Sequence, residues 1–170
     1  MPKVELEPCP EAAKAALAAM FQLYVHDFSE QWAGTARGEL QDDGTFPAYP
    51  HLDSYWRDAR REPLLIRADG SLAGFALIND HSHSGLPLDY AVAEFFVVRK
   101  HRRSGVGRSA ATAFMIDRPG RWELAIARTN AAARAFWRRI ADELAESGEV
   151  EEIERADELW NGPIIRFRVG

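Results

Sequence analysis

The residues best suited to chemistry gather around a short basic loop near the middle of the chain. Residues 102–107 follow an apolar run that ends at Val98, and they precede a stretch with helical spacing. A strand, a glycine-containing turn and a helix start together aim free backbone N–H groups and a helix dipole at one point. Glycines let the backbone approach a phosphate closely, and arginines add positive charge. The pattern predicts a phosphate site.

The charge of this segment has a second interpretation. Five arginines, lysines and histidines at positions 99–103, with Arg108, form a basic run that solvent alone could explain. The chain as a whole carries 26 acids against 21 bases and a net charge of −5, which disfavours non-specific binding to nucleic acid. A local basic patch on an acidic protein suits a small polyanion. Neither the nucleotide-binding loop with a Gly-Lys-Ser/Thr ending nor the dinucleotide fingerprint fits the spacing.

Glu94 is the most suggestive titratable residue. It interrupts an otherwise apolar run, 90–98, where a buried carboxylate is costly unless a cation pairs with it or it takes part in chemistry. Both interpretations remain open at this level. Strand alternation places Glu94 on the same face as Phe96 and Val98.

The length and overall composition of the chain limit the class of protein to which it can belong. The chain has 170 residues, of which 46% are hydrophobic, so we expect one domain over 1–170 with a real core. No long apolar run or secretory signal is present, which predicts a cytoplasmic protein without membrane contact. The single cysteine, Cys9, has no partner for a disulfide. His81 and His83 stand in a loop without further ligands at suitable spacing, so we expect no metal.

Hydrophobic periodicity and turn residues predict the elements that position these groups. Asp69-Gly70 marks a two-residue hairpin. The expected strands are 4–6, 64–68, 72–78, 90–98, 122–127, 149–153 and 164–169, and the expected helices are 10–27, 51–61, 105–115 and 130–144. Residues 29–50 are expected to form a long loop, and the run 90–98 a central strand buried on both faces. The order predicts a mixed α/β sheet with one parallel pair and a right-handed crossover.

Two motifs together resemble the GCN5-related N-acetyltransferase superfamily. Arg102-x-x-Gly105-x-Gly107 after a central strand is similar to its coenzyme A signature, R/Q-x-x-G-x-G/A. The stretch from Asn130 to Trp137 is similar to a second family pattern, N-x-x-A-x-x-F-Y. The resemblance covers residues 64–140 well. It implies the family fold, which is a mostly antiparallel sheet of about seven strands with a splayed parallel pair and helices on both faces.

The resemblance also implies a set of site residues. Glu94 would accept the proton of an incoming amine, and the backbone N–H of Val97 would bind the oxyanion if a bulge frees it there. Asn130 would hydrogen-bond near the pantetheine or the acyl group. The expected coenzyme contacts are Phe96, Val97, Val98, Arg102, Arg103, Ser104, Gly105, Val106, Gly107, Arg108, Asn130, Phe136 and Trp137.

One departure from the family pattern affects catalysis. Trp137 stands where many members carry a tyrosine that protonates the departing thiolate, and an indole N–H cannot release a proton near neutral pH. A thiol with a pKa of about 8.5 can leave as the thiolate without that acid. Helical spacing equally allows Trp137 to be a core residue, and it favours a core place for Tyr24 over a place in the wall of an acceptor pocket.

The sequence therefore predicts an N-acetyltransferase that uses acetyl-coenzyme A and needs no metal. Its expected partner is a small-molecule primary amine, with neither nucleic acid nor membrane, and self-association into a homodimer is compatible with the sequence. The acceptor is not identified. Two alternatives stay open: a non-catalytic module that senses acetyl-coenzyme A, and a basic loop that binds a different nucleotide or a protein.

Overall fold

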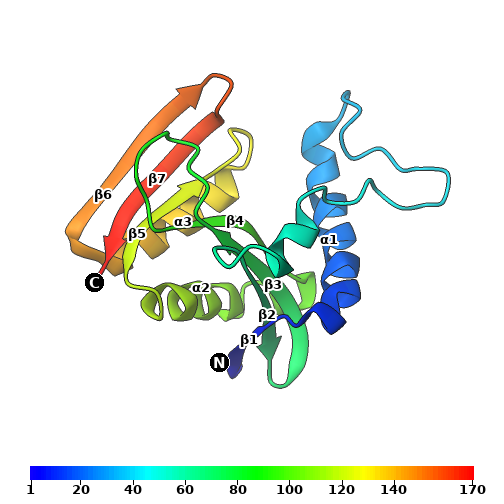
Figure 1. Cartoon of the computed structure of the whole chain (residues 1–170), viewed down its shortest axis with the longest axis horizontal. Coiled ribbons are helices and arrows are strands. Elements are labelled where there is room, and N and C mark those ends of the chain that lie inside the picture. Colours follow the sequence, from blue (N-terminus) through cyan, green and yellow to red (C-terminus); the bar gives the residue numbers. More distant parts are fainter.

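One mixed sheet organises the chain, and the computed structural model describes it over residues 1–170 (Figure 1). Its strand order is β1-β2-β3-β4-β5-β7-β6, and only the β4–β5 pair is parallel. The strands are β1 (Val4–Pro8), β2 (Glu62–Ala68), β3 (Ser71–Asn79), β4 (Tyr90–Val97), β5 (Gly120–Ala125), β6 (Ala145–Ala156) and β7 (Asn161–Val169). The predicted fold class is confirmed.

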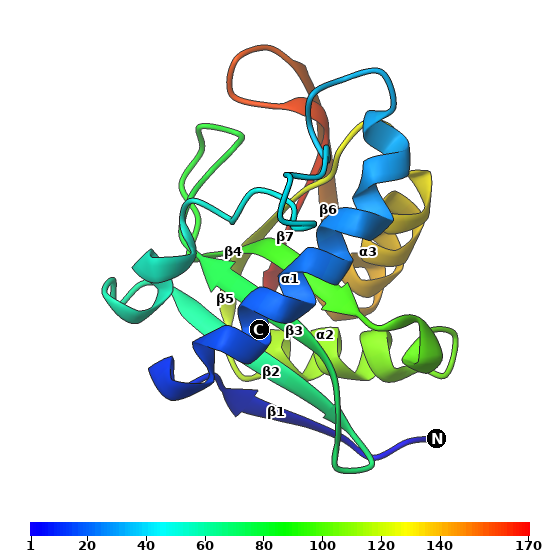
Figure 2. The ribbon, with the colours of Figure 1, turned by 90° about the vertical axis from the view of Figure 1, so that its right-hand side faces the viewer.

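Three α-helices cover the two faces of the sheet. Helix α1 (Lys14–Ser29) crosses one face, and α2 (Val106–Ile116) and α3 (Ala131–Leu144) lie behind the other (Figure 2). Short 3₁₀ turns occupy Glu11–Ala13, Glu30–Trp32, Leu52–Trp56 and Arg99–His101. No helix combines the length and the apolar character that crossing a bilayer requires.

Local turn chemistry fixes the first hairpin. Asp69 and Gly70 have φ values of 49° and 76°, which are the left-handed conformations that a two-residue connection between β2 and β3 requires. The hairpin predicted at this dipeptide is confirmed.

Apolar residues on the two faces of the sheet form separate cores. Under α1, Leu17 and Phe21 pack with Phe75 and Phe96 of the sheet. Behind the sheet, α2 and α3 pack on the strands through a set that includes Phe114, Met115, Trp122, Leu124, Ile140 and Ile165. The strands at the centre of the sheet, β4 among them, send alternate side chains to the two cores. Packing on both faces therefore holds β4 in place at its two ends.

The parallel pair is short and then opens. β4 and β5 pair only through Tyr90 with Trp122 and Ala91 with Glu123. On its other side β4 pairs with β3 along its length, interrupted by a bulge in which Ala93 is the extra residue. The expectation that β4 is buried on both faces is wrong between Val92 and Phe95, where the side chains are half-buried because β5 has moved away.

Two other boundaries differ from the sequence prediction. Residues 51–61 contain a 3₁₀ turn instead of a longer helix. Helix α3 ends at Leu144, and β6 begins at Ala145, because Ala145 already pairs with Val169 of β7. Ser147 and Gly148 have positive φ values of 63° and 69° and lie within the irregular part of β6. The strand expected to start at 149 therefore begins four residues earlier, and Ser147 and Gly148 form an irregularity within it.

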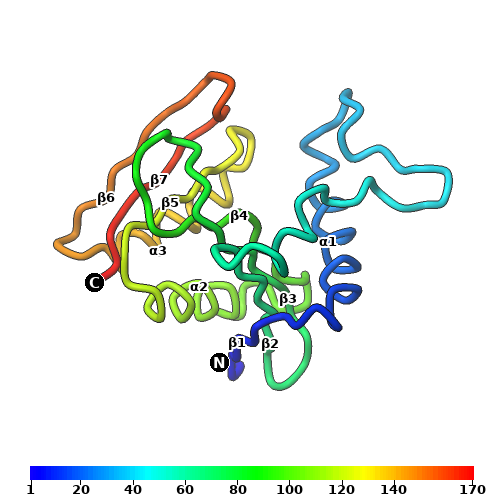
Figure 3. The backbone as a smooth tube through the Cα atoms, in the orientation of Figure 1, coloured from blue at the N-terminus to red at the C-terminus, as the bar shows by residue number.

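The segment between the 3₁₀ turn after α1 and the next 3₁₀ turn, residues 33–51, is the predicted long loop. It extends from the end of α1 and returns to it (Figure 3). Its return is fixed by the Gln22 side chain, which accepts from the Phe46 N–H at 2.7 Å and donates to the Phe46 carbonyl at 3.1 Å. Phe46 itself is buried in the core under α1.

Candidate active site

The basic loop after β4 presents a row of unpaired backbone donors. Arg103 and Gly105 have φ values of 60° and 86°, and Gly105 is the residue that caps α2. The first backbone bond of the helix runs from the Ser109 N–H to the Gly105 carbonyl at 2.9 Å. The N–H groups of residues 103–108 donate to no backbone or side-chain acceptor. Six adjacent free donors at a helix N-terminus fit a phosphate or pyrophosphate.

Arg102 holds this loop in place. Its Nε donates to the Val97 carbonyl at 2.7 Å, its guanidinium lies 5.5 Å from the centre of the Phe96 ring, and it pairs with Asp27 at the end of α1. Arg99 binds the same carboxylate at 2.8 Å. The guanidinium of Arg102 therefore points back toward the protein, and its role in this structure is to shape the loop.

Asp27 is the anchor that both arginines share. Burial acts to raise the pKa of Asp27, but hydrogen bonds from Arg102 and Arg99 outweigh it and hold the pKa below its usual value. The stabilisation is therefore present above the pKa of the unfolded chain and is lost as pH falls through the folded-state pKa.

We expect Asp27→Asn to reduce the free energy of unfolding by about 1 kcal/mol at pH 7, because two charge-assisted hydrogen bonds are weakened at a mostly buried carboxylate. Urea denaturation at pH 7 and at acidic pH measures this, and the difference from wild type should shrink in acid. Asp42→Asn, at an exposed aspartate in the loop, is the matched control and should leave stability unchanged. Equal stability of Asp27→Asn and wild type at both pH values would contradict the anchoring role.

Positive charge surrounds the free donors. Lys100 and Arg103 are exposed and form no ion pair, and Arg108 pairs with Glu143 at 3.1 Å on the surface. Ser104 turns its hydroxyl to the His101 carbonyl at 2.8 Å, and Val106 is fully buried beneath the loop. The predicted contact residues 102–108 therefore divide into groups that shape the loop and groups that face solvent.

The open edge of β4 follows from its pairing with β3. The Val98 N–H donates to the Ala73 carbonyl at 2.8 Å, so alternation directs the N–H groups of Phe96 and Glu94 toward β3 as well. The N–H groups of Phe95 and Val97 point to the opposite edge, where β5 no longer pairs. The opening of the parallel pair frees the Val97 N–H, whereas the bulge lies earlier, at Ala93.

Glu94 lies half-buried on the α1 face of this edge. Burial raises its pKa to about 7, against the opposing effects of hydrogen bonding from Tyr24 and the charge of Arg37. No arginine or lysine forms an ion pair with Glu94, so the structural ion pair considered from the sequence is absent. A carboxylate with a pKa near neutrality can accept and release a proton under physiological conditions.

Aromatic rings form the other face of the open edge. Phe95 stacks on Phe136 at 5.9 Å between ring centres and meets Trp137 edge-on at 5.1 Å. Trp137 is 7% exposed. Its N–H has no acceptor in the protein and is not among the fully buried unpaired atoms, so it retains contact with solvent. The Asn130 Oδ1 caps α3 by accepting from the Ala133 N–H at 3.0 Å, which leaves its amide NH₂ free.

The structure brings most of the predicted residues to one place and adds one. Glu94, Val97, the loop 102–108 and the Phe136 and Trp137 rings of α3 border the open half of β4. Phe96 and Val98 turn their backbone amides to β3, and Phe95, which sequence reasoning passed over, lies at the open edge instead. Tyr24 packs edge-on against Phe75 and Phe96 in the core under α1, as its helical spacing favours.

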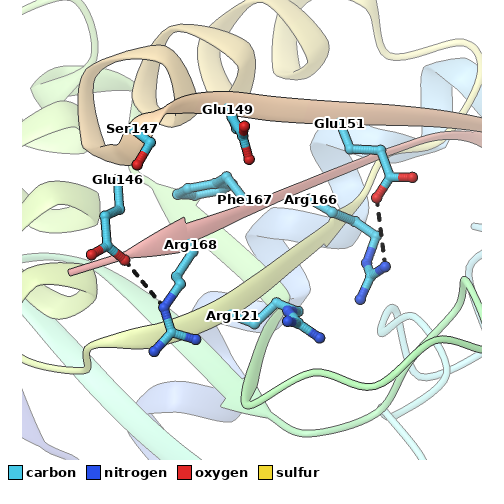
Figure 4. A pocket seen from close by; sticks show the side chains of 8 residues that line it. All are labelled: Arg121, Glu146, Ser147, Glu149, Glu151, Arg166, Phe167 and Arg168. Atoms are coloured by element: carbon cyan, nitrogen blue, oxygen red, sulfur yellow. Dashed lines mark hydrogen bonds and ion pairs between the residues drawn. The ribbon is translucent and has the colours of Figure 1, made fainter.

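Two surface hollows lie away from this edge. One of about 370 Å³ sits on β5, β6 and β7, where Arg166 reaches Glu151 and Arg168 reaches Glu146 (Figure 4). Three arginines and three glutamates line it, so their charges balance and no anion site results. The second, of about 500 Å³, is a shallow surface at the β6–β7 turn. No group of three or more His, Cys, Asp or Glu side chains is placed to share a metal ion.

Comparisons with known proteins agree with the architecture. An acetyltransferase of the GNAT family from Staphylococcus aureus superposes with a TM-score of 0.63 at 11% identity, covering 99% of this chain and 100% of that one. An acetyltransferase from Thermus thermophilus gives 0.64 at 15% identity, with 98% and 96% covered. The ribosomal-protein-S18-alanine N-acetyltransferase of Escherichia coli gives 0.58 at 15% identity, with 99% and 95% covered. At these identities the likeness concerns the fold.

No curated protein matches the sequence significantly. The model of the acetyltransferase (GNAT) family matches residues 17–141, a span that runs from α1 through the basic loop to α3. With the open β4–β5 pair and the row of free N–H groups, this match shows that the chain belongs to the acetyltransferase (GNAT) family, whose members are transferases that move acyl groups.

Proposed function

We propose that the protein is an N-acetyltransferase that transfers the acetyl group of acetyl-coenzyme A to the primary amine of a small molecule. The observation that carries the proposal is the open half of β4, which lies between a row of six free N–H groups and a carboxylate with a pKa of about 7. A pyrophosphate fits the first, and an amine that must lose a proton fits the second.

The open edge of β4 can hold an extended ligand arm between the six free N–H groups and Glu94. The Phe95 N–H and carbonyl and the Val97 N–H are free to pair with the amides of a pantetheine as an added strand would. Residues 103–108 would hold the pyrophosphate, and the free amide of Asn130 would donate near the arm. When bound, acetyl-coenzyme A supplies an activated thioester.

Three groups of the chain would then act on the reaction. Glu94 accepts one proton from the ammonium form of the acceptor, and the freed amine nitrogen bonds to the thioester carbon. The second proton of that nitrogen passes to solvent as the carbon–sulfur bond breaks. The Val97 N–H donates to the carbonyl oxygen as negative charge develops on it. The carbon–sulfur bond breaks and the thiolate leaves, while the Trp137 N–H is free to donate to the sulfur. Holding the two reactants together contributes the larger part of the rate.

The acceptor is proposed to be small and cationic before it reacts. Glu94 lies on the sheet face that α1 covers, where Tyr24 and Phe28 present half-buried aromatic rings, and a carboxylate in such surroundings binds an ammonium group well. The acidic character of the chain, with a net charge of −5, favours the same class of acceptor over polyanions.

A second candidate function rests on Trp137. Because an indole cannot protonate a thiolate, a protein of this family with tryptophan at this position could bind acetyl-coenzyme A without turning it over. Such a module would report on the acetyl-coenzyme A level. Release of free thiol separates the two functions.

We expect acetyl-coenzyme A and coenzyme A to raise the Tm of the protein, and ATP at the same concentration to raise it less, because stabilisation follows from binding to the folded state. A ligand at 100 times its Kd contributes about 2.7 kcal/mol, which corresponds to a shift of several degrees for a chain of this size. A shift with ATP alone would contradict the proposed coenzyme.

The catalytic part of the proposal has its own measurement. Incubation with acetyl-coenzyme A and a panel of primary amines, from aromatic monoamines to polyamines, should release free thiol with at least one acceptor. Binding without thiol release across the panel would favour the sensing function instead. Both outcomes are read against the same protein without an amine, which corrects for slow hydrolysis.

A further inference from the structure

A buried carboxylate holds the loop between β3 and β4 on the second half of the sheet (Figure 1). Glu123 of β5 is 1% exposed, and its carboxylate accepts from the N–H groups of His83 at 2.6 Å and Ser84 at 3.1 Å. The Ser84 hydroxyl donates to it at 2.6 Å, and the Nε of Arg166 in β7 lies 3.3 Å away. Because a buried carboxylate needs such partners, they fix the backbone of the loop at His83.

Two aromatic rings, those of His83 and Trp160, meet beside this anchor, and we call the pair the aromatic platform. The ring centres lie 4.5 Å apart. The Nδ1 of His83 donates to the Leu159 carbonyl at 3.2 Å, and the indole N–H of Trp160 donates to the Ile126 carbonyl at 3.0 Å. Both side chains are half-buried, so each keeps part of its surface open. Backbone carbonyls therefore hold both rings in one place.

The register of the strands places the platform on the same face of the sheet as Glu94. Asn79 of β3 pairs with Ala91, and Ala91 pairs with Glu123, so these three side chains share one face. Leu77, two positions before Asn79, shares that face and pairs with Glu94. Glu94 thus lies one row further along β4, where β5 has moved away. The platform, which is tied to the end of β5, borders the other side of the same gap.

The charges beside the platform are already matched. Glu123 pairs with Arg166, and Asp157 pairs with Arg155 at 2.6 Å. Burial lowers the pKa of His83, although its hydrogen bond to a backbone carbonyl opposes this shift, so the imidazole is uncharged at neutral pH. Two neutral rings with paired charges around them suit a flat, uncharged group better than a second ammonium group.

We propose that His83 and Trp160 bind the side group of the acceptor, and that this group is an aromatic ring a few bonds from the amine nitrogen. The inference rests on the proposed function, which places the amine at Glu94. An acceptor with a short linker then reaches from Glu94 on β4 to the platform across the gap. Aromatic rings prefer offset or edge-on contact with one another, and an aliphatic ring of the same size does not reproduce this contact.

The test compares phenethylamine with cyclohexylethylamine, which have the same charge and linker and differ in the aromatic character of the ring. Putrescine represents an acceptor with a second ammonium group. Isothermal titration measures the Kd of each amine for the protein alone and for the protein with coenzyme A, so the readout needs no turnover.

Two variants locate the binding. Trp160→Leu removes the larger ring of the platform. Trp56→Leu is the matched control, because Trp56 is also half-buried and its indole N–H also donates to a backbone carbonyl, that of Cys9, at 2.8 Å.

We expect the wild type to bind phenethylamine about fivefold more tightly than cyclohexylethylamine. Trp160→Leu should raise the Kd of phenethylamine about tenfold and abolish the preference, whereas Trp56→Leu should leave the Kd unchanged. If an acceptor is turned over, its KM should rise in Trp160→Leu while kcat is kept. If Trp160→Leu does not fold, His83→Leu takes its place and should also reduce the preference.

Four results would each overturn the inference: equal affinity of the wild type for the two ring-bearing amines, tighter binding of putrescine, no binding of phenethylamine, or a preference that survives in Trp160→Leu. Thiol release with aliphatic amines alone would also overturn it and would leave the proposed function standing. A preference that depends on Trp160 in a protein that releases no thiol would refute only the proposed function.

Discussion

Glu94→Gln should lower kcat by about 100-fold or more and leave the affinity for acetyl-coenzyme A unchanged. The glutamine amide has nearly the shape of the carboxyl but cannot accept the proton of the amine. In the wild type, kcat/KM should rise with pH up to the pKa of Glu94, about 7, and then level off, because only the ionised carboxyl is a base. The pH profile of the variant's kcat/KM should not show this rise. Steady-state kinetics over a pH series, together with a binding isotherm for acetyl-coenzyme A, measures both effects.

A stability measurement controls for damage to the fold. The pKa of Glu94 is raised in the folded protein, so its ionisation opposes folding, and wild-type stability should fall as pH rises through about 7. Glu94→Gln has no such loss and should be at least as stable as wild type at pH 8. A variant that turns over an identified acceptor at the wild-type rate would remove Glu94 from the catalytic role.

Gly74→Ala should lower the free energy of unfolding by about 3 kcal/mol and the Tm by about 6 to 12 °C. Gly74 lies in β3 opposite Val97, and a Cβ there would stand 2.0 Å from the Phe96 carbonyl oxygen and 3.1 Å from the Val97 Cα. Both neighbours are backbone atoms of β4, so no side-chain rotation relieves the clash. β4 must move away from β3, and the strand that carries the site moves with it.

Gly107→Ala is the matched control for this substitution. The added methyl would meet Phe136 and Phe95 at 3.7 and 3.8 Å, which is ordinary contact, and the residue is helical. Its stability should stay the same or rise by up to about 1 kcal/mol. Thermal and urea denaturation of the two variants beside wild type measures the difference. A Tm of Gly74→Ala within about 2 °C of the wild-type Tm would contradict the close approach of β3 and β4, because so small a shift lies outside the expected range.

Local chemistry explains which elements the sequence could predict. The Asp69-Gly70 turn depends on adjacent residues and is found as predicted. The helix expected to begin near Asn130 is also found, and Asn130 caps it through a bond to a residue three positions on. The start of β6 at Ala145 depends on pairing with Val169, which no local pattern records. Arg166 alternates with apolar residues as an exposed strand residue would, yet it is 7% exposed and lies 3.3 Å from the buried Glu123. In such cases, contact with a residue far away in the sequence determines where the strand begins or whether the side chain is buried.

The same division applies to the site. The loop from Arg102 to Gly107 is visible in the sequence because a phosphate-binding turn needs glycines and positive charge at short spacing. Whether a given β4 amide faces β3 or the open edge depends on register with β3, so the sequence indicates neither the place of Phe95 nor the orientation of Phe96. The packing of Tyr24 against Phe96 is hidden because the two residues lie 72 positions apart along the chain.

The shortness of the β4–β5 ladder has a mechanical consequence. Two residue pairs join the halves of the sheet, and beyond Ala91 no backbone bond spans the gap. Widening or narrowing the gap therefore breaks no hydrogen bond of the ladder, and the resistance comes from the helices packed behind it. If the chain binds coenzyme A thioesters, we expect a gap held in this way to accept acyl groups of different size while the pairing within β1–β4 and within β5–β7 stays intact.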